Sequence, residues 1–169
     1  MRLGEGVEWA AHCTVLLACL PPETTLSAAR LAEYHGVPGP YLAKALQALS
    51  GAGIIESVSG RHGGYRLARP AQAISLLEVV HAVEGTEQAF RCSEIRRRGP
   101  TAVPARSYTP TCAIAAAMWA AEDAWRQQLA SVSVAALAET VMATSPAAAM
   151  AKATSWLGGA VRQRERSDT

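Results

Sequence analysis

Apolar residues recur at intervals of three and four along the first part of the chain, which is the spacing of one face of a helix. The Pro21–Pro22 pair interrupts this pattern, because proline cannot continue a helix. Thr25 or Ser27 can then cap a second helix, and Gly36 can end it. The pattern therefore predicts two amphipathic helices. Their apolar faces carry Trp9, Cys13, Leu16, Leu17 and Leu20 in the first, and Leu26, Ala29, Leu31 and Ala32 in the second.

A third helix is predicted after a short break that contains two prolines. Pro40 suits the first turn of a helix, where its missing N–H is not needed, and Gly51 and Gly53 can end the helix. The helix has two distinct faces, so one is expected to be buried and the other to meet solvent or a partner. The buried stripe consists of Leu42, Ala45, Leu46 and Leu49, and the polar face of Tyr41, Lys44, Gln47 and Ser50.

The periodicity then changes to that of short strands. The segments 54–58 and 65–67 are predicted to pair as a hairpin, because the glycine-rich segment 60–64 between them favours a turn. A fourth helix is expected from Ser75 to Gly85. Helices followed by a hairpin with a basic, glycine-rich tip have the order of a winged helix-turn-helix. The predicted fold class is mainly α with a small β-hairpin wing, followed by a long dimerisation helix.

The long helix is predicted from Ala113 to about Leu129, and a further helix from Val134 to Met142. The long helix is rich in alanine and has a broad apolar face but no core of its own. Pairing with a second copy of the chain would cover that face, so a homodimer is expected. The side chains expected in the interface are Met118 and either Trp119 or Trp125.

Composition sets the cellular context that we expect for the protein. Half of the 169 residues are apolar, but no run of 18 uncharged apolar residues occurs, so no membrane span is expected. Glu5 and Glu8 stand where a secretory signal would carry positive charge, so a cytoplasmic location is expected. Four cysteines in such a location are not expected to form structural disulfides, so each is either a small buried hydrophobe or chemically active.

The net charge of +2 conceals an uneven distribution of arginine. One cluster lies at residues 61–69 and a second at residues 91–98. Such clusters suit phosphate groups, although a solvated surface explains the charge equally well. The sequence contains no phosphate-binding loop, no nucleophile with a paired base and no dinucleotide fingerprint. We therefore expect neither an enzyme nor a protein with a small-molecule substrate.

Several motifs resemble one bacterial family in their order along the chain. They are "YL" in the third helix, "GGYRLARP" on the wing, "ISLLEVV" in the fourth helix and "CAIAAAMWAAEDAW" in the long helix. Together these motifs resemble the Rrf2 group of winged-helix transcriptional regulators over about residues 1–140. The resemblance implies a homodimer that binds a palindromic operator in double-stranded DNA.

The predicted polar face of the third helix fits this implied function, because such a helix can lie in the major groove. Tyr41, Lys44 and Gln47 are the candidate contacts on that face. Arg61 and His62 at the tip of the wing are candidates for phosphate or minor-groove contacts. Tyr65 and Arg69 have a simpler interpretation. Tyr65 is expected to pack at the base of the wing rather than to contact DNA, and Arg69 can be a charge at the wing edge.

The loop between Cys92 and Cys112 departs from the family pattern, because cluster-binding members usually have three cysteines there and this chain has two. The chain is more similar to a redox-sensitive subtype in "GVEWA", "LAKALQALS", "EIRRRGP" and "AMWAAE". That subtype holds a [2Fe–2S] cluster by two Cys, one His and one Glu. The resemblance carries these roles to Cys92, Cys112, His35 and Glu8, with Trp9 as a neighbour that would respond to the cluster.

The chemistry tolerates this ligand set, since two thiolates can terminate one iron while a nitrogen and an oxygen take the other. The loop has few apolar residues, so a metal centre is expected to hold its two ends. A dimer could bring Glu8 and His35 of one protomer against the loop of the other. His12 is the rival nitrogen ligand, being one helical turn from Glu8, and Cys19 is the next sulfur to test. Cys13 and Cys19 are nevertheless both expected in the core.

The resulting hypothesis is a repressor whose operator affinity changes with the state of the cluster. Two alternatives remain. One is a cluster-free member of the family that uses Cys92 and Cys112 as a thiol switch or responds to a protein partner. The other is a metal-binding assembly or scaffold protein that does not bind DNA. The predicted parts are the DNA-binding domain at 1–85, the cluster-binding loop at 86–112, the dimerisation helices at 113–143 and a mobile tail at 144–169.

Overall fold

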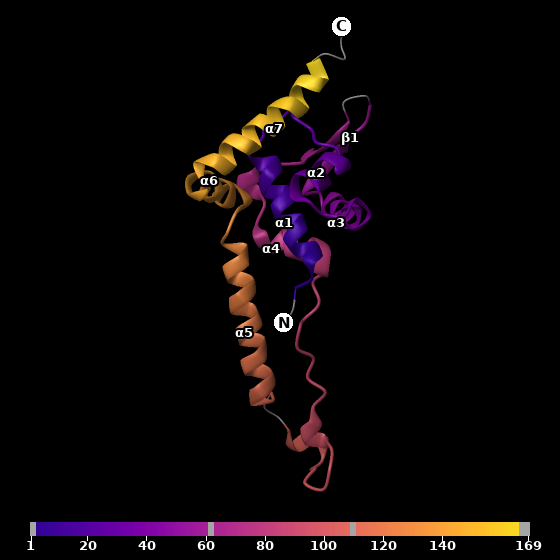
Figure 1. The fold of residues 1–169 in the computed structure, drawn as a ribbon. Coiled ribbons are helices and arrows are strands. Elements are labelled where there is room, and N and C mark those ends of the chain that lie inside the picture. Colours follow the sequence, from indigo (N-terminus) through magenta and orange to yellow (C-terminus); the bar gives the residue numbers. More distant parts are fainter. Residues whose placement is uncertain (1–2, 61–62, 109–110, 166–169) are drawn as a thin grey trace.

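The computed structural model describes residues 3–60, 63–108 and 111–165 of the chain, and its architecture is mainly helical with one small hairpin (Figure 1). Short 3-10 turns occupy residues 71–73, 95–97 and 105–107. The fold class expected from the sequence is confirmed. The elements are α1 (Glu5–Ala18), α2 (Ala28–His35), α3 (Gly39–Gly51), β1 (Ile55–Val58), β2 (Gly64–Leu67), α4 (Leu76–Glu84), α5 (Ala113–Ala130), α6 (Val134–Thr144) and α7 (Ala147–Glu165).

The core of the winged domain lies where α1 packs against α3 and α4. The predicted buried stripe of α3 is confirmed, because all four of its apolar residues are buried. Burial of aliphatic side chains of this size contributes roughly 1.5–3 kcal/mol each, so the core orients α3 strongly. The largest fully buried side chains include Leu31, Leu42, Leu46, Leu49, Ile54, Ile55, Ile74 and Val79.

Serine caps begin three of the helices. The side chain of Ser27 accepts the backbone N–H of Arg30 at 3.2 Å, so Ser27 rather than Thr25 caps α2. Ser75 and Glu78 form a reciprocal capping box at the start of α4, and Ser133 caps α6. Each cap satisfies an N–H group that would otherwise lack a partner in the first turn. The helix starts predicted near Ser27 and Ser75 are thereby explained.

The wing is a two-stranded antiparallel hairpin in which Ile55 pairs with Leu67 and Val58 with Gly64. Leu26 extends this sheet by exchanging two backbone hydrogen bonds with Tyr65, at 2.8 and 3.1 Å. Gly64 is required at this crossing, because a Cβ atom there would lie 2.6 Å from the backbone of Leu26. The base of the wing is thus fixed to the segment that leads into α2.

Helix α5 extends away from the winged domain, and residues 86–108 run beside it toward its far end (Figure 1). The chain then returns through α6, which packs against α1 and buries Val134, Ala135 and Ala138. A backbone bridge between Ser75 and Ser133 ties the start of α6 to the start of α4. The helices predicted for this half of the chain are therefore present, and α5 ends one residue beyond Leu129.

Most of the segment 144–169, expected to be a mobile tail, forms the 19-residue helix α7. The aromatic rings of Trp156 and Tyr34 lie 5.3 Å apart, and Leu157 packs against the core. The sequence missed this helix because its apolar residues are spaced widely among alanines. No single helix in the described part of the chain is long and apolar enough to cross a membrane; only α6 and the first part of α7, bent by 117°, reach such a length and composition together.

Candidate functional site

The polar face of α3 is exposed on the side opposite its buried stripe. Tyr41, Lys44 and Gln47 are all exposed, and Tyr41 keeps 59% of its surface accessible. Their spacing of three residues places them along one side of the helix. These three residues are called the recognition face below. A helix that presents such a face, and is held from behind by a core, has the form that can enter a DNA groove.

The tip of the wing, with the candidate contacts Arg61 and His62, lies outside the described residues. Tyr65, at the base of the wing, packs against the core, in agreement with the structural role expected for it. Strand β2 lies next to the segment that leads into α2, because Leu26 forms a backbone bridge with Tyr65. The described part of the wing is therefore held by the core and by the segment that leads into α2.

Two wing arginines are paired with acids. Arg66 donates to Glu56 and to Glu23, at 2.7 Å in each case. Arg69 donates to Glu78 at 2.6 Å, and it also donates to two backbone carbonyls. These pairs neutralise part of the basic cluster seen in the sequence. Arg69 consequently has a structural role at the edge of the wing, which was the simpler interpretation of this residue.

Cys92 and Cys112 line the same pocket, although 19 residues separate them in the chain. The pocket has a volume of 320 Å³ and lies between the loop and the first turns of α5. It is called the cysteine pocket below. Both thiols are free and half-buried. The remaining lining residues are Glu94, Tyr108, Thr111, Ala115 and Trp119.

Cys112 is the residue immediately before α5, at the positive end of the helix. The backbone N–H of Ala115 lowers the pKa of the Cys112 thiol below its ordinary value, with further contributions from the N–H of Ile114 and the charge of Arg96. A lowered pKa favours the thiolate, which is the form that binds metals and attacks disulfides. The site is thus suited to either kind of chemistry.

Polar contacts within the loop were missed by the sequence analysis. The guanidinium of Arg96 donates to the carboxylate of Glu94 at 2.8 Å and lies 5.0 Å from the ring centre of Tyr108. The Tyr108 hydroxyl donates to the backbone carbonyl of Arg96 at 2.5 Å. Trp119 reaches the loop from α5 and donates its indole N–H to the carbonyl of Phe90 at 3.2 Å. These hydrogen bonds and the ring contact hold the loop in place, whereas its low apolar content had led us to expect that a metal centre would do so.

His35 and Glu8 belong to the winged domain. His35 is the last residue of α2, and its ring lies 5.8 Å from that of His12. The buried Nε2 atom of His35 has no hydrogen-bond partner among the described residues. Burial, with a smaller effect of His12, lowers the pKa of His35, so its imidazole is favoured in the neutral form that can bind a metal. Glu8 is exposed in the first turn of α1, one helical turn before His12.

In a single chain Cys92 and Cys112 share a pocket, whereas His35 and Glu8 belong to the winged domain. The cysteine pocket lies beside the outer part of α5, whereas α1 and α2 lie in the winged domain (Figure 1). Within residues 3–60, 63–108 and 111–165, no group of three or more His, Cys, Asp and Glu side chains is arranged to hold a metal ion.

Trp9 connects the first helix to the recognition face. Its ring contacts that of Tyr41 edge-on, with 6.5 Å between ring centres and 63° between ring planes. Trp9, Tyr41 and Lys44 line a common pocket of 360 Å³ between α1 and α3. A displacement of the first turns of α1 would therefore reach the recognition face through a single side chain.

The other two cysteines differ from one another. Cys13 is fully buried in the core, as expected, and burial raises the pKa of its thiol to about 12. Cys19 is exposed at the end of α1, so the expectation that it belongs to the core is wrong. The periodic pattern failed there because Cys19 follows the last helical residue. It lines a pocket of 420 Å³ with His12, Tyr34, His35 and residues of α6 and α7.

One side of α5 is apolar and exposed. Ile114 keeps 69% of its surface accessible and Met118 keeps 46%, and these residues are one helical turn apart. Trp119 instead faces the loop of its own chain, which leaves Trp125 as the tryptophan closer to the exposed side. This exposed side is where the sequence analysis expected a second copy.

The winged helix-turn-helix and its exposed recognition face define a DNA-binding domain of the transcriptional-regulator class. The family described as iron-dependent transcriptional regulators, Rrf2, matches residues 3–140. The chain belongs to the Rrf2 family. It is 30% identical over 141 residues to the protein YffB of Lactococcus lactis, whose name describes an HTH-type transcriptional regulator; the match covers 82% of this chain and 88% of YffB.

Further relatives and solved structures agree with the family. Protein aau3 of Rhizobium meliloti is 35% identical over 130 residues, which cover 76% of this chain and 79% of aau3. The structure of CymR, the global cysteine regulator of B. subtilis, superposes with a TM-score of 0.67 at 20% identity and covers 83% of this chain and 98% of CymR. The structure of T. potens IscR gives a TM-score of 0.66 at 21% identity, covering 87% and 93% respectively. These two structures confirm the fold.

Proposed function

We propose that this transcriptional regulator is a homodimer that binds a palindromic operator in double-stranded DNA and senses redox state through a [2Fe–2S] cluster. Cys92 and Cys112 are the thiolate ligands, and His35 and Glu8 supply the nitrogen and the oxygen. The observation that carries the proposal is the shared pocket of the two cysteines, one of which has a lowered pKa at the start of α5.

The donor set fits this group. Two thiols that face one pocket can bind one iron, and a neutral imidazole with a free ring nitrogen can bind the other. The exposed carboxylate of Glu8 is one helical turn before His12, whose ring centre lies 5.8 Å from that of His35. A bound [2Fe–2S] cluster would supply a one-electron redox step.

Dimerisation through α5 completes the proposal. The two ligand pairs are separate within one chain, so a site made of all four needs the loop of one protomer and the winged domain of its partner. The exposed apolar side of α5, with Ile114 and Met118, supplies a surface on which two copies can pair. The same pairing would place two recognition faces on opposite halves of a palindrome.

Trp9 provides the route from the ligands to the DNA. It follows Glu8 in the sequence and contacts Tyr41 on the recognition face. A change in the position of Glu8 would turn the first turns of α1, and the indole would then displace Tyr41. Operator affinity would fall when this displacement changes the spacing between the recognition faces of the dimer.

The test is purification in the absence of oxygen, followed by absorption spectroscopy and assays of iron and sulfide. The wild-type protein is expected to be coloured and to contain iron and sulfide in equal amounts. Cys92→Ala and Cys112→Ala should be colourless, whereas Cys19→Ala, as the matched control, should resemble wild type. Glu8→Ala and His35→Ala should retain a cluster with altered absorption and a shorter lifetime. A wild-type protein without iron would overturn the cluster proposal.

A thiol switch is the second candidate, and the lowered pKa of Cys112 beside Cys92 favours it. The Cys112 thiolate would attack a low-molecular-weight disulfide and release one thiol. Cys92 would then displace the second thiol and close the Cys92–Cys112 disulfide. This candidate predicts the same operator response in an iron-free protein, and mass spectrometry would detect the loss of two hydrogen atoms from the oxidised chain.

A further inference from the structure

A buried carboxylate lies on α5 outside the cysteine pocket. Glu122 is only 8% exposed, although most residues of α5 around it are exposed. Hydrogen bonds from Arg126 lower the pKa of Glu122, so the buried group is charged. A buried charge is retained only where specific partners compensate for its lost hydration. Its partners therefore indicate what it does.

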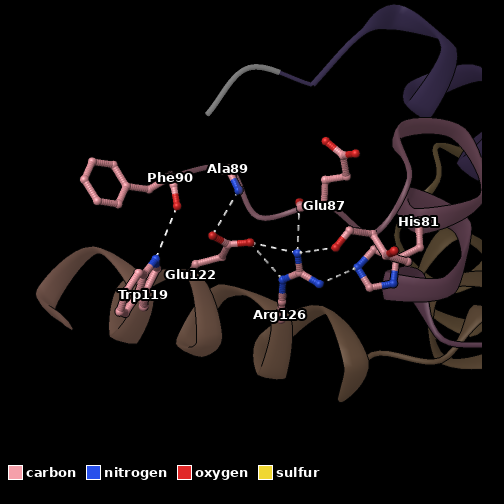
Figure 2. Close-up of polar contacts among 8 residues, drawn as sticks. His81, Glu87, Ala89, Phe90, Trp119, Glu122 and Arg126 are labelled. Carbon is pink, nitrogen blue, oxygen red and sulfur yellow. Dashed lines mark hydrogen bonds and ion pairs between the residues drawn. The ribbon is translucent and has the colours of Figure 1, made fainter. Parts of the chain in front are cut away.

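Each oxygen of Glu122 has a different partner (Figure 2). One oxygen accepts from Arg126, at 2.7 Å from Nη2 and 3.1 Å from Nε. The other accepts the backbone N–H of Ala89 at 3.1 Å. The carboxylate of Glu122 thus links the backbone of the loop to Arg126, which lies one helical turn further along α5.

Arg126 extends the same contact toward the winged domain (Figure 2). Its Nη2 atom donates to the carbonyl oxygens of Thr86 and Glu87, at 3.1 and 3.2 Å. Its Nη1 atom lies 3.2 Å from the Nε2 atom of His81 on α4. Arg126 therefore fixes the point where the chain leaves α4 and enters the loop.

These contacts lead directly to the cysteine pocket. Trp119, Glu122 and Arg126 lie on one side of α5 and together hold the backbone of residues 86–90; they are called the α5 clamp below. Cys92 follows this segment by two residues, and Cys112 is the N-cap of the helix that carries the clamp. The clamp consequently fixes the position of residues 86–90 along α5. This position in turn determines where Cys92 lies relative to Cys112.

We infer that Glu122 and Arg126 are positioning residues that hold Cys92 opposite Cys112. Their importance for a cluster rests on the function proposed above. The positioning itself is a property of the two thiols and can be measured without iron. Loss of Glu122 leaves the Ala89 N–H without its acceptor and removes the carboxylate that holds the Arg126 guanidinium, so the segment before Cys92 should detach from α5.

The experiment measures how readily the two thiols are bridged. The iron-free protein with Cys19→Ser is treated with dibromobimane, which fluoresces strongly after it links two thiols; Cys13 can stay, because it is fully buried. Rapid bridging is expected in this background. Glu122→Ala and Arg126→Ala should bridge several-fold more slowly, while the exposed neighbour variant Asp123→Ala should match the background. Glu122→Gln, which keeps an acceptor for Ala89, should restore part of the rate.

Cluster lifetime gives the second measurement. After reconstitution, Glu122→Ala and Arg126→Ala should lose the visible absorption of the cluster about 10- to 100-fold faster than Asp123→Ala. If Glu122→Ala and Arg126→Ala, or Arg126→Lys where an Ala variant does not fold, bridge and hold iron as Asp123→Ala does, the inference is wrong. Absence of bridging in the Cys19→Ser background would also overturn it.

The two proposals can fail separately. If the wild-type protein binds no iron but bridging depends on Glu122 and Arg126, the positioning role stands and the cluster proposal fails. If the wild-type protein binds a cluster whose lifetime and thiol bridging are unaffected by these variants, the cluster proposal stands and the positioning role is overturned.

Discussion

Lys44 occupies the middle of the recognition face, between Tyr41 and Gln47 on the exposed side of α3. A lysine in this position can reach a phosphate beside the groove in which the helix lies. Lys44→Ala is expected to weaken operator binding and to reduce the slope of log affinity against log salt by about one. Binding measured by fluorescence anisotropy at several salt concentrations tests this.

The matched control is Lys152→Ala, which removes an exposed lysine from α7. Both variants change the net charge equally, so any difference between them reports the position of the lost charge rather than its amount. Equal effects of the two variants, or an unaltered salt dependence for Lys44→Ala, would exclude α3 as the helix that meets the DNA.

For individual residues, the sequence predicted which side chains are exposed or buried, but it did not predict which partners they contact. The buried stripe of α3 follows from helical spacing, so Tyr41, Lys44 and Gln47 could be assigned to the exposed side. The contacts of Glu94 could not be anticipated, because they depend on a left-handed backbone conformation, with φ of 49°, inside an irregular loop. The Glu–Arg pair at positions 122 and 126 was a visible signal for the α5 clamp, since a spacing of four suits an ion pair on a helix.

Among the elements, α5 carries the expected dimer surface. Met118 lies on its exposed apolar side with Ile114, and an arginine there would place a charge in the middle of the interface. Met118→Arg is expected to give monomers or insoluble protein, as measured by size-exclusion chromatography with light scattering. Gln127→Arg adds the same charge on the opposite side of the helix and should leave the dimer intact. A stable dimer of Met118→Arg would place the interface elsewhere.

Element boundaries could be predicted wherever a local signal stops or starts a helix. Ser27, Ser75 and the glycines at positions 36 and 85 act within a few residues of themselves, so the sequence located the ends of α2 and α4. Helix α7 has weak local signals, because alanine is helical without marking a face. Its packing on α2 through Trp156 depends on a contact with Tyr34, more than 100 residues earlier, which no local pattern contains.

For the whole molecule, mixing two variant chains tests the proposal that each cluster site takes its ligands from both protomers. One chain carries Cys92→Ala and Cys112→Ala, and the other carries Glu8→Ala and His35→Ala. If each site is shared between protomers, a mixed dimer contains one site with all four ligands, formed by the intact cysteines of the second chain and the intact winged domain of the first. Mixed dimers should therefore hold a cluster with the lifetime of wild type, measured by its visible absorption.

The same experiment has a clear opposite outcome. If all four ligands came from one chain, neither chain of the mixed dimer would contain a complete set. Mixing would then recover no stable absorption. The homodimers of each variant are the controls, and chains with two different affinity tags allow the mixed dimer to be isolated before it is reconstituted.

This arrangement also explains the limit of sequence reasoning about the site. The positions of Cys92 and Cys112 relative to each other follow from a loop that closes on one helix, and the chain alone determines them. In the proposed shared site, the relation between that pair and His35 would depend on how two copies associate. The family resemblance supplied the ligand set, but the spacing of residues along one chain cannot contain the geometry of a second.

The α5 clamp has a consequence for how this sequence can vary. On the loop side it contacts the carbonyl oxygens of Thr86, Glu87 and Phe90, which every residue type supplies, and the N–H of Ala89, which every residue type except proline supplies. The side chains of residues 86–90 are therefore free to drift among relatives, whereas the Glu–Arg pair on α5 should change little. Proline at position 89 is the exception, because it lacks the N–H that Glu122 accepts.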